Sequence, residues 1–165
     1  MPSNDLNLIR LALGRLGETG SQAVVAGGWA RELLGLCAPC AHSDIDLLFL
    51  DTSFDAVDGW LARKPQGIVE IAGKRFAHKR AFTLRDTMVE FILVERDAMG
   101  SVTYFCGDVP YRWIEPLTVS VQAGSGNESF SVISPENLAH FEAQYATLQP
   151  WRWREPGSLV ARPNS

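Results

Sequence analysis

The chain has 165 residues, a net charge of −4 and 46% hydrophobic residues, which is typical of about one folded domain and excludes a wholly disordered chain. The acidic balance argues against a general nucleic-acid binder, which would carry a basic excess. The first residues lack the basic and apolar regions of a signal peptide, and no apolar stretch approaches the roughly 18 residues that cross a membrane. Because the cysteine count of three is odd, we predict reduced thiols in a cytoplasmic protein.

The first part of the chain alternates between helical and strand patterns. Apolar residues at helical spacing predict a helix over residues 6–16, with Ser3 or Asn4 as its cap and Gly17 or Gly20 at its end. The further elements predicted here are a buried strand at 23–26, a short helix at 29–34, a strand at 45–50 and a helix at 54–61. Asp51 or Thr52 is the predicted cap of the last helix.

The second part of the chain is predicted to be mainly strands. These are expected at 68–71, 76–84, 88–95 and 130–133, and a last helix begins at Pro135. Residues 98–128 are rich in Gly, Pro and Ser and show no clear pattern. The order of elements predicts an α+β domain over residues 1–149, with a mixed sheet covered by helices, followed by a Trp- and Pro-rich tail at 150–165.

Two aspartates, Asp44 and Asp46, stand at the start of the strand predicted at 45–50. Residues i and i+2 of a strand point to the same face, about 6.6 Å apart along the backbone, so the two carboxylates can converge on a cation. Oxygen ligands of this kind suit Mg²⁺, which commonly binds through one or two carboxylates and substrate phosphates. The alternative is an exposed strand end with two solvated carboxylates.

A glycine pair, Gly27-Gly28, lies between a predicted strand and a predicted helix. Glycines at such a junction let the backbone approach a ligand, and the N–H groups that follow can bind a phosphate. The segment is neither a Walker loop nor a G-x-G-x-x-G motif. Taken alone, the pair could equally be a simple turn.

Together these features resemble the nucleotidyltransferase superfamily of the polymerase-β type. The Gly27-Gly28-Trp29-Ala30 segment, Glu32, and His42 two residues before Asp44-Ile45-Asp46 are similar to the small lincosamide and aminoglycoside nucleotidyltransferases. The match is dense over residues 24–49 and extends less closely to the start of the last helix. It implies a nucleotidyltransferase-like fold, with a mixed sheet flanked by helices.

The resemblance also implies a set of metal ligands. Asp44 and Asp46 take the two aspartate positions, and a third carboxylate from a neighbouring strand completes the site or accepts the proton of the attacking hydroxyl. Glu90 is the candidate, because it stands inside an apolar strand. Its alternative is an outward-facing position, since its neighbours would then face the core. Weaker candidates for the third carboxylate are Asp86, Glu95 and Asp97.

The implied activity is Mg²⁺-dependent transfer of a nucleoside monophosphate from a nucleoside triphosphate, predicted to be ATP, to a hydroxyl of a small molecule such as an antibiotic. Residues 63–85 hold seven basic residues and one acidic residue, which can place cations beside phosphates or can form solvated strands. The residues predicted to hold the nucleotide are Gly27, Gly28, Arg31 and His42, with Lys79 and Arg80 facing pyrophosphate.

The chain departs from the family at Cys40, where relatives commonly carry a basic residue, and its predicted last helix from Pro135 is short, where larger relatives have a helical acceptor domain. An acceptor pocket would then need a second subunit or residues 98–128, and we predict a homodimer. Aromatic residues could line this pocket, although aromatic residues in this number more often belong to the core or to a dimer interface. The aromatic candidates are Tyr104, Phe105, Tyr111, Trp113, Trp151 and Trp153. The departures leave open an inactive nucleotidyltransferase fold that serves as a toxin–antitoxin or partner-binding module. Transfer to a protein or a tRNA end is a third possibility, which the net acidity disfavours for tRNA.

The cysteines allow two further interpretations. Cys37 and Cys40 form a C-x-x-C that follows a helix and precedes a strand, the reverse of the order in redox domains. A zinc site built from Cys37, Cys40, His42 and Cys106 lacks a second paired motif. We therefore expect ordinary loop cysteines.

Overall fold

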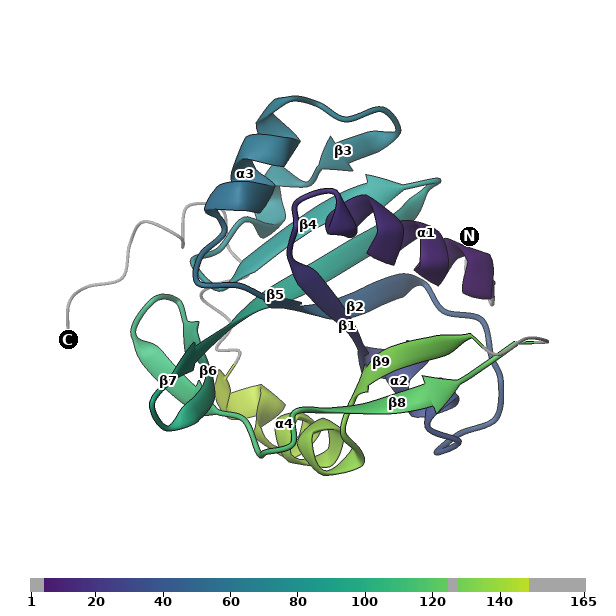
Figure 1. Ribbon diagram of the computed structural model, residues 1–165, viewed down its shortest axis with the longest axis vertical. Helices are drawn as coiled ribbons and strands as arrows, with labels where there is room; N and C mark the ends of the chain where they lie inside the picture. The colour runs from purple at the N-terminus through teal and green to yellow at the C-terminus, as the bar shows by residue number, and fades with distance from the viewer. Residues whose placement is uncertain (1–4, 125–127, 149–165) are drawn as a thin grey trace.

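The computed structural model describes residues 5–124 and 128–148 of the chain and contains one mixed sheet. Its strands are β1 (Gln22–Ala26), β2 (Asp44–Leu50), β3 (Ile68–Glu70), β4 (Lys79–Leu84), β5 (Thr87–Asp97), β6 (Gly100–Phe105), β7 (Val109–Arg112), β8 (Thr118–Gln122) and β9 (Ser129–Ile133). The main path runs β3-β4-β5-β2-β1-β9-β8, and the end of β5 pairs with the β6–β7 hairpin (Figure 1). The pairs β2–β5 and β1–β9 are parallel and the others antiparallel.

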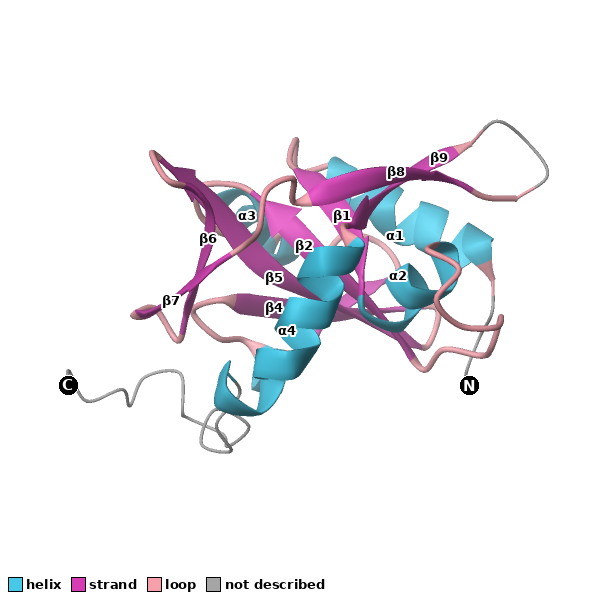
Figure 2. Ribbon diagram, turned by 90° about the horizontal axis from the view of Figure 1, so that it is seen from below, coloured by secondary structure: helices cyan, strands magenta, loops and turns pink. Residues whose placement is uncertain are grey.

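Helices cover both faces of this sheet. They are α1 (Leu6–Gly17), α2 (Gly27–Leu33), α3 (Asp55–Ala62) and α4 (Pro135–Leu148), with a 3₁₀ turn, η1, at Ala72–Lys74. Figure 2 shows α2 and α4 in front of the sheet and α1 and α3 behind it. The predicted α+β class with a mixed, helix-flanked sheet is confirmed. In the described part of the chain, none of the helices combines the length and apolarity needed to cross a membrane.

The strand register decides which side chains share a face. In the parallel pair of β2 and β5, Asp46 lies beside Glu90. In the antiparallel pair of β4 and β5, Lys79 lies opposite Ile92 and Ala81 opposite Glu90. Because neighbouring positions across a sheet point to the same side, Asp46, Glu90 and Lys79 all face α4. The alternate residues of these strands, such as Arg80, face α3.

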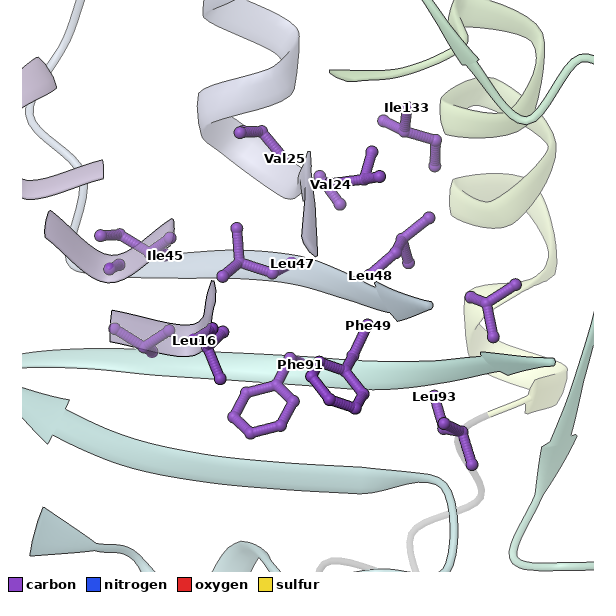
Figure 3. Close-up of a cluster of buried hydrophobic side chains, with 14 of the residues drawn as sticks. Leu16, Val24, Val25, Ile45, Leu47, Leu48, Phe49, Phe91, Leu93 and Ile133 are labelled. Atoms are coloured by element: carbon purple, nitrogen blue, oxygen red, sulfur yellow. The ribbon is translucent and has the colours of Figure 1, made fainter. Parts of the chain in front are cut away.

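The face that α3 covers is an aromatic and aliphatic core. Phe49 and Phe91 lie 5.5 Å apart, and Phe54, just before α3, lies 5.8 Å from Phe49. On α3 itself, Trp60 packs edge-on against Phe82 at 5.7 Å. Figure 3 shows Phe49 and Phe91 side by side within the buried cluster. Burial of large apolar side chains, worth about 1.5–3 kcal/mol each, holds β2 and β5 in the register that positions the site.

Two helix caps differ from the predictions. Asp5 caps α1 by accepting the backbone N–H of Asn7 at 2.9 Å, because a side chain directly before the first turn reaches its free N–H groups. The predicted caps, residues 3 and 4, lie outside the described residues. The prediction that Asp51 or Thr52 caps α3 is wrong: the helix begins after Phe54, without a side-chain cap bond. Asp51 instead accepts the N–H of Thr52 at 2.6 Å.

The segment 98–128, which showed no clear pattern, contains β6, β7 and β8. Its order comes from contacts that are distant in the sequence. The Trp113 indole donates to the Thr103 hydroxyl at 2.9 Å, and Thr103 donates to the carbonyl of Leu93 at 2.7 Å. Asn137 of α4 is fully buried and bonds both the N–H and the carbonyl of Ile114, at 2.8 and 2.7 Å. These bonds tie the β6–β7 hairpin to β5 and the following segment to α4.

Candidate functional site

Three carboxylates converge where β2 and β5 run side by side. Asp44 and Asp46 of β2 and Glu90 of β5 each offer an oxygen, and these atoms lie within 4.8 Å of one another. The parallel register places Asp44 beside Met88 and Asp46 beside Glu90. The three carboxylate side chains therefore project from the same face of the sheet. Glu90 therefore faces the aspartate pair, and its alternative outward orientation is excluded. We call Asp44, Asp46 and Glu90 the carboxylate cluster.

Burial and charge repulsion both disfavour ionisation in the carboxylate cluster. The pKa of Asp46 is raised to about 7, first by burial and then by the charges of Asp44 and Glu90, which Lys79 and Lys74 offset only in part. Such a carboxyl group either takes up a proton or needs additional positive charge nearby to stay ionised. The oxygen-only donor set and this excess of negative charge fit a hard divalent cation such as Mg²⁺.

Two lysines contact Glu90. Lys79 Nζ lies 3.1 Å from Glu90 Oε2, and Lys74 Nζ bonds Glu90 Oε1. Burial alone would raise the pKa of Glu90, but the charges and hydrogen bonds of Lys79 and Lys74 outweigh it, so this pKa lies below its ordinary value. Lys79 was predicted near this site. Lys74 was not predicted there, because it lies in η1, where the alternation of side chains along a strand does not apply. The sequence indicated it only as one of the basic residues of the run 63–85.

The glycine pair makes room for two polar side chains. Gly27 has φ of +59°, and a Cβ there would lie 2.3 Å from Asp46 Oδ2, so only glycine fits. A Cβ on Gly28 would lie 3.0 Å from His42 Nδ1. The absence of side chains at Gly27 and Gly28 therefore lets the side chains of Asp46 and His42 lie against the start of α2. The predicted contact of the glycine pair with a nucleotide stays a prediction.

His42 belongs to a second cluster on the other side of Gly28. Its ring packs on Trp29 with centroids 4.4 Å apart, and its Nε2 lies 3.1 Å from Glu32 Oε1. The same Glu32 oxygen accepts the backbone N–H of Cys40 at 2.8 Å. Glu32 therefore fixes both the imidazole and the loop that leads into β2.

The two arginines predicted at the site have other partners. Arg31 of α2 forms an ion pair with Glu142 of α4. Arg80 lies on the opposite face of the sheet, where its Nε is 2.7 Å from Asp58 Oδ1 and its guanidinium lies over the Phe54 ring at 4.3 Å. The predicted contact of Arg80 with pyrophosphate is thus corrected, because strand alternation turns Arg80 away when Lys79 faces the carboxylates.

A pocket of about 240 Å³ opens between the carboxylate cluster and α4. Its polar wall is the carboxylate cluster with Lys79 and Glu142. Its apolar wall comprises Leu48, Ile92, Trp113, Ile133, Leu138 and Phe141. Of the aromatic residues predicted to line an acceptor pocket, Trp113 does so, Phe105 and Tyr111 are buried, and Tyr104 is partly exposed. Residues 151 and 153 lie outside the described residues.

The chain matches no family model and no curated protein sequence, whereas several solved structures resemble it. The crystal structure of the lincosamide antibiotic adenylyltransferase LnuA, bound to lincomycin, matches with a TM-score of 0.65 and 13% identity, over 83% of this chain and 85% of that one. The crystal structure of ANT(2")-Ia in complex with adenylyl-2"-tobramycin matches with a TM-score of 0.62 and 17% identity, over 90% and 79%. The chain therefore has the nucleotidyltransferase fold.

Proposed function

We propose that the chain transfers a nucleoside monophosphate from a nucleoside triphosphate to a hydroxyl group of a small molecule. The observation that carries this proposal is the convergence of Asp44, Asp46 and Glu90 beside a pocket, in a chain with the nucleotidyltransferase fold. Two structural neighbours, an adenylyltransferase bound to lincomycin and a protein bound to adenylyl-2"-tobramycin, favour ATP as the nucleotide and an antibiotic among the acceptors.

The carboxylate cluster is the proposed Mg²⁺ site. Asp44 and Asp46 would hold the ion from one strand and Glu90 from the next. When bound, Mg²⁺ withdraws charge from phosphate oxygens and so stabilises their reacting form. The low pKa of Glu90, caused by Lys79 and Lys74, favours a metal-ligand role over that of proton acceptor, because a general base works best with a pKa near the working pH.

The reaction forms a bond between the acceptor hydroxyl oxygen and the α-phosphorus, breaks the bond from that phosphorus to the β-phosphate bridge, and releases the hydroxyl proton to water. Pyrophosphate leaves with the additional negative charge. Lys79 lines the pocket and is 13% exposed, so its ammonium supplies a fixed positive charge for the departing phosphates. Lys74 is more exposed, at 39%, and contacts the other carboxylate oxygen of Glu90, Oε1.

The apolar wall of the pocket is the proposed acceptor surface. Trp113 and Phe141 stack with ring centroids 5.4 Å apart, and Ile133 and Leu138 extend the wall towards the carboxylate cluster. An apolar wall facing a charged one orients a molecule that carries both an apolar face and a hydroxyl. Glu142, which also lines this pocket, forms an ion pair with Arg31. The homodimer inferred from the sequence stays a prediction.

The test is a turnover assay on the full chain with Mg²⁺, each nucleoside triphosphate and a panel of lincosamides, aminoglycosides and other hydroxylated antibiotics. We expect pyrophosphate release and an acceptor heavier by one nucleoside monophosphate in mass spectra. Asp46→Asn should lower the rate by about 100-fold or more, whereas Asp55→Asn, an exposed change on α3, should leave it unchanged. Absence of product with every acceptor, or full activity in Asp46→Asn, would contradict the proposal.

A further inference from the structure

A second group of metal-ligating atoms lies beside the carboxylate cluster and is chemically different from it. Glu32 comes from α2, and Cys40 and His42 come from the segment between α2 and β2. His42 Nε2 lies 3.1 Å from Glu32 Oε1 and 3.9 Å from Cys40 Sγ, and the three ligating atoms all lie within 4.8 Å of one another. The group therefore offers one carboxylate, one thiol and one imidazole to the same point.

These spacings are close to those around a tetrahedral zinc ion. Zinc binds sulfur at about 2.3 Å and nitrogen or oxygen at about 2.0–2.2 Å, so tetrahedral angles put neighbouring ligand atoms about 3.4–3.6 Å apart. The distances from His42 Nε2, 3.1 and 3.9 Å, lie on either side of that value. Cys40 is exposed, so a small rotation of its side chain can bring the thiol into place.

The surrounding structure holds the imidazole and the carboxylate in position. Trp29 packs on the His42 ring at 4.4 Å, and Gly28 leaves the space in which that ring sits. The Cys40 N–H holds the Glu32 carboxylate at 2.8 Å. The side chains of His42 and Glu32 are only 9% and 11% exposed. A His–Glu hydrogen bond alone would explain two of the three groups, but not a thiol directed at the same ring nitrogen.

We propose that Glu32, Cys40 and His42 bind one Zn²⁺ ion, with the fourth position taken by water. Thiolate and imidazole ligands select zinc over Mg²⁺, whereas the carboxylate cluster offers oxygen alone. Binding releases the Cys40 thiol proton and replaces the Glu32–His42 hydrogen bond with a metal bond to each side chain. The ion thereby links the segment that precedes β2 to α2. This site is independent of the proposed transferase activity.

The proposed site differs from the zinc site that the sequence suggested, which consisted of Cys37, Cys40, His42 and Cys106. Cys106 lies away from this group: it follows β6, and its backbone N–H donates to His78 Nδ1 at 2.9 Å. Glu32, which that set did not include, takes the place of the missing ligands. The carboxylate could not be found by spacing rules for cysteine and histidine, because it comes from the preceding helix.

The test uses Zn²⁺ and Co²⁺ as probes on the full, reduced chain with excess Mg²⁺ present to occupy the carboxylate cluster. We expect one tightly bound Zn²⁺ per chain and, with Co²⁺, a thiolate-to-metal charge-transfer absorption. Cys40→Ser should abolish that absorption and weaken Zn²⁺ binding by more than about tenfold. Cys37→Ser is the matched control and should change neither. Circular dichroism of each metal-free variant checks that the exposed substitution leaves the fold intact.

Several results would overturn the site. These are no Zn²⁺ retained, a Co²⁺ absorption that persists in Cys40→Ser, or Zn²⁺ binding that Cys37→Ser weakens as much as Cys40→Ser. Loss of Zn²⁺ binding in Asp44→Asn would assign the ion to the carboxylate cluster instead. Because the readout is metal binding and not turnover, failure of this proposal leaves the proposed transferase activity untouched, and the converse also holds.

Discussion

Two neighbouring residues of β4, Lys79 and Arg80, show how differently the two faces of the sheet treat buried charge. On the face covered by α3, Arg80 meets Asp58 through two hydrogen bonds, at 2.7 and 3.0 Å, and lies over the Phe54 ring. Burial would raise the pKa of Asp58, but Arg80 and Arg75 lower it below its ordinary value. Here each charge has a matched partner, and the arrangement serves stability.

The face turned towards α4 leaves negative charge in excess. Among the described residues, the three carboxylates of the cluster share Lys79 and Lys74, and both lysines contact Glu90. The consequence is the raised pKa of Asp46, about 7. Unmatched buried charge costs stability in the free protein, and the proposed cation would supply the missing positive charge. The contrast is therefore between a structural ion pair and a proposed binding site.

The sharpest test of this contrast replaces each β4 cation by the apolar methionine. Arg80→Met leaves Asp58 with Arg75 alone, which is 37% exposed, and also removes the hydrogen bonds of Arg80 to the carbonyls of Phe76 and Lys79. It should lower the free energy of unfolding by about 2–4 kcal/mol. Lys79→Met, one residue away on the other face, leaves Glu90 paired with Lys74 and should cost less than about 1 kcal/mol. Urea unfolding of both variants measures this. Equal losses would show that the two faces do not differ.

The next test concerns the room that Gly27 leaves for Asp46. Gly27→Ala puts a residue with a side chain into the left-handed backbone conformation of Gly27 and places its Cβ 2.3 Å from Asp46 Oδ2. The change should lower the free energy of unfolding by about 1–2 kcal/mol. It should also weaken divalent-metal binding by moving that carboxylate. Gly14→Ala on α1, where nothing lies within 4 Å of the added Cβ, should instead stabilise by about 0.5–1 kcal/mol. Thermal unfolding with and without Mg²⁺ distinguishes the two variants. A Gly27→Ala variant as stable as the wild type would refute the close approach of Gly27 to Asp46.

The carboxylate cluster should make the metal-free protein less stable at alkaline pH. The pKa of Asp46 is higher in the folded chain, about 7, than in the unfolded chain, so its contribution to stability falls as the pH rises from about 4 to 7 and stays low above. At pH 8, Asp46→Asn should therefore stabilise the metal-free protein by about 2 kcal/mol. Chemical unfolding in a chelator at pH 5 and pH 8 provides the measurement. A destabilising Asp46→Asn at pH 8 would contradict the raised pKa.

The opposite pH dependence is expected on the α3 face, with a smaller effect. Because the pKa of Asp58 is lowered in the folded chain, the ion pair stabilises above the ordinary carboxyl pKa and loses its contribution as the pH falls below it. Between pH 5 and pH 3, wild type should therefore lose more stability than Arg80→Met, which lacks the pair. Identical acid losses in the two proteins would show that Asp58 titrates normally.

Local patterns were sufficient to predict most of the elements outside residues 98–128 and the shared face of the two aspartates on β2. Helical spacing located α1 and α4, and the i, i+2 rule placed Asp44 and Asp46 on one face. The direction of Glu90 could not be predicted, because it depends on the parallel register between β2 and β5, two strands separated by about forty residues. The resemblance to a known family suggested Glu90, and the register decided between its two orientations.

The features that were predicted wrongly or missed share one physical cause. Contacts between residues distant in the sequence decide side-chain directions and strand positions that local spacing cannot determine. Lys79 and Arg80 were both predicted to face phosphate, but adjacent strand residues cannot share a face, and only the packing of Phe54 and Asp58 shows which one turns away. Residues 98–128 carry no period of their own, because Thr103 and Asn137 order them through bonds to other elements. The approach of Glu32 to His42 likewise follows from the fold.

Direct measurement of Mn²⁺ binding by electron paramagnetic resonance tests most simply whether the unmatched carboxylates hold a divalent cation. Mn²⁺ takes the same oxygen ligands as Mg²⁺ and gives a signal that falls when the free ion is bound. We predict that the wild type and Asp55→Asn bind Mn²⁺ equally in the presence of ATP, and that Asp46→Asn binds it more than about tenfold less tightly. Equal Mn²⁺ affinity in Asp46→Asn and the wild type would show that the carboxylate cluster does not hold the cation.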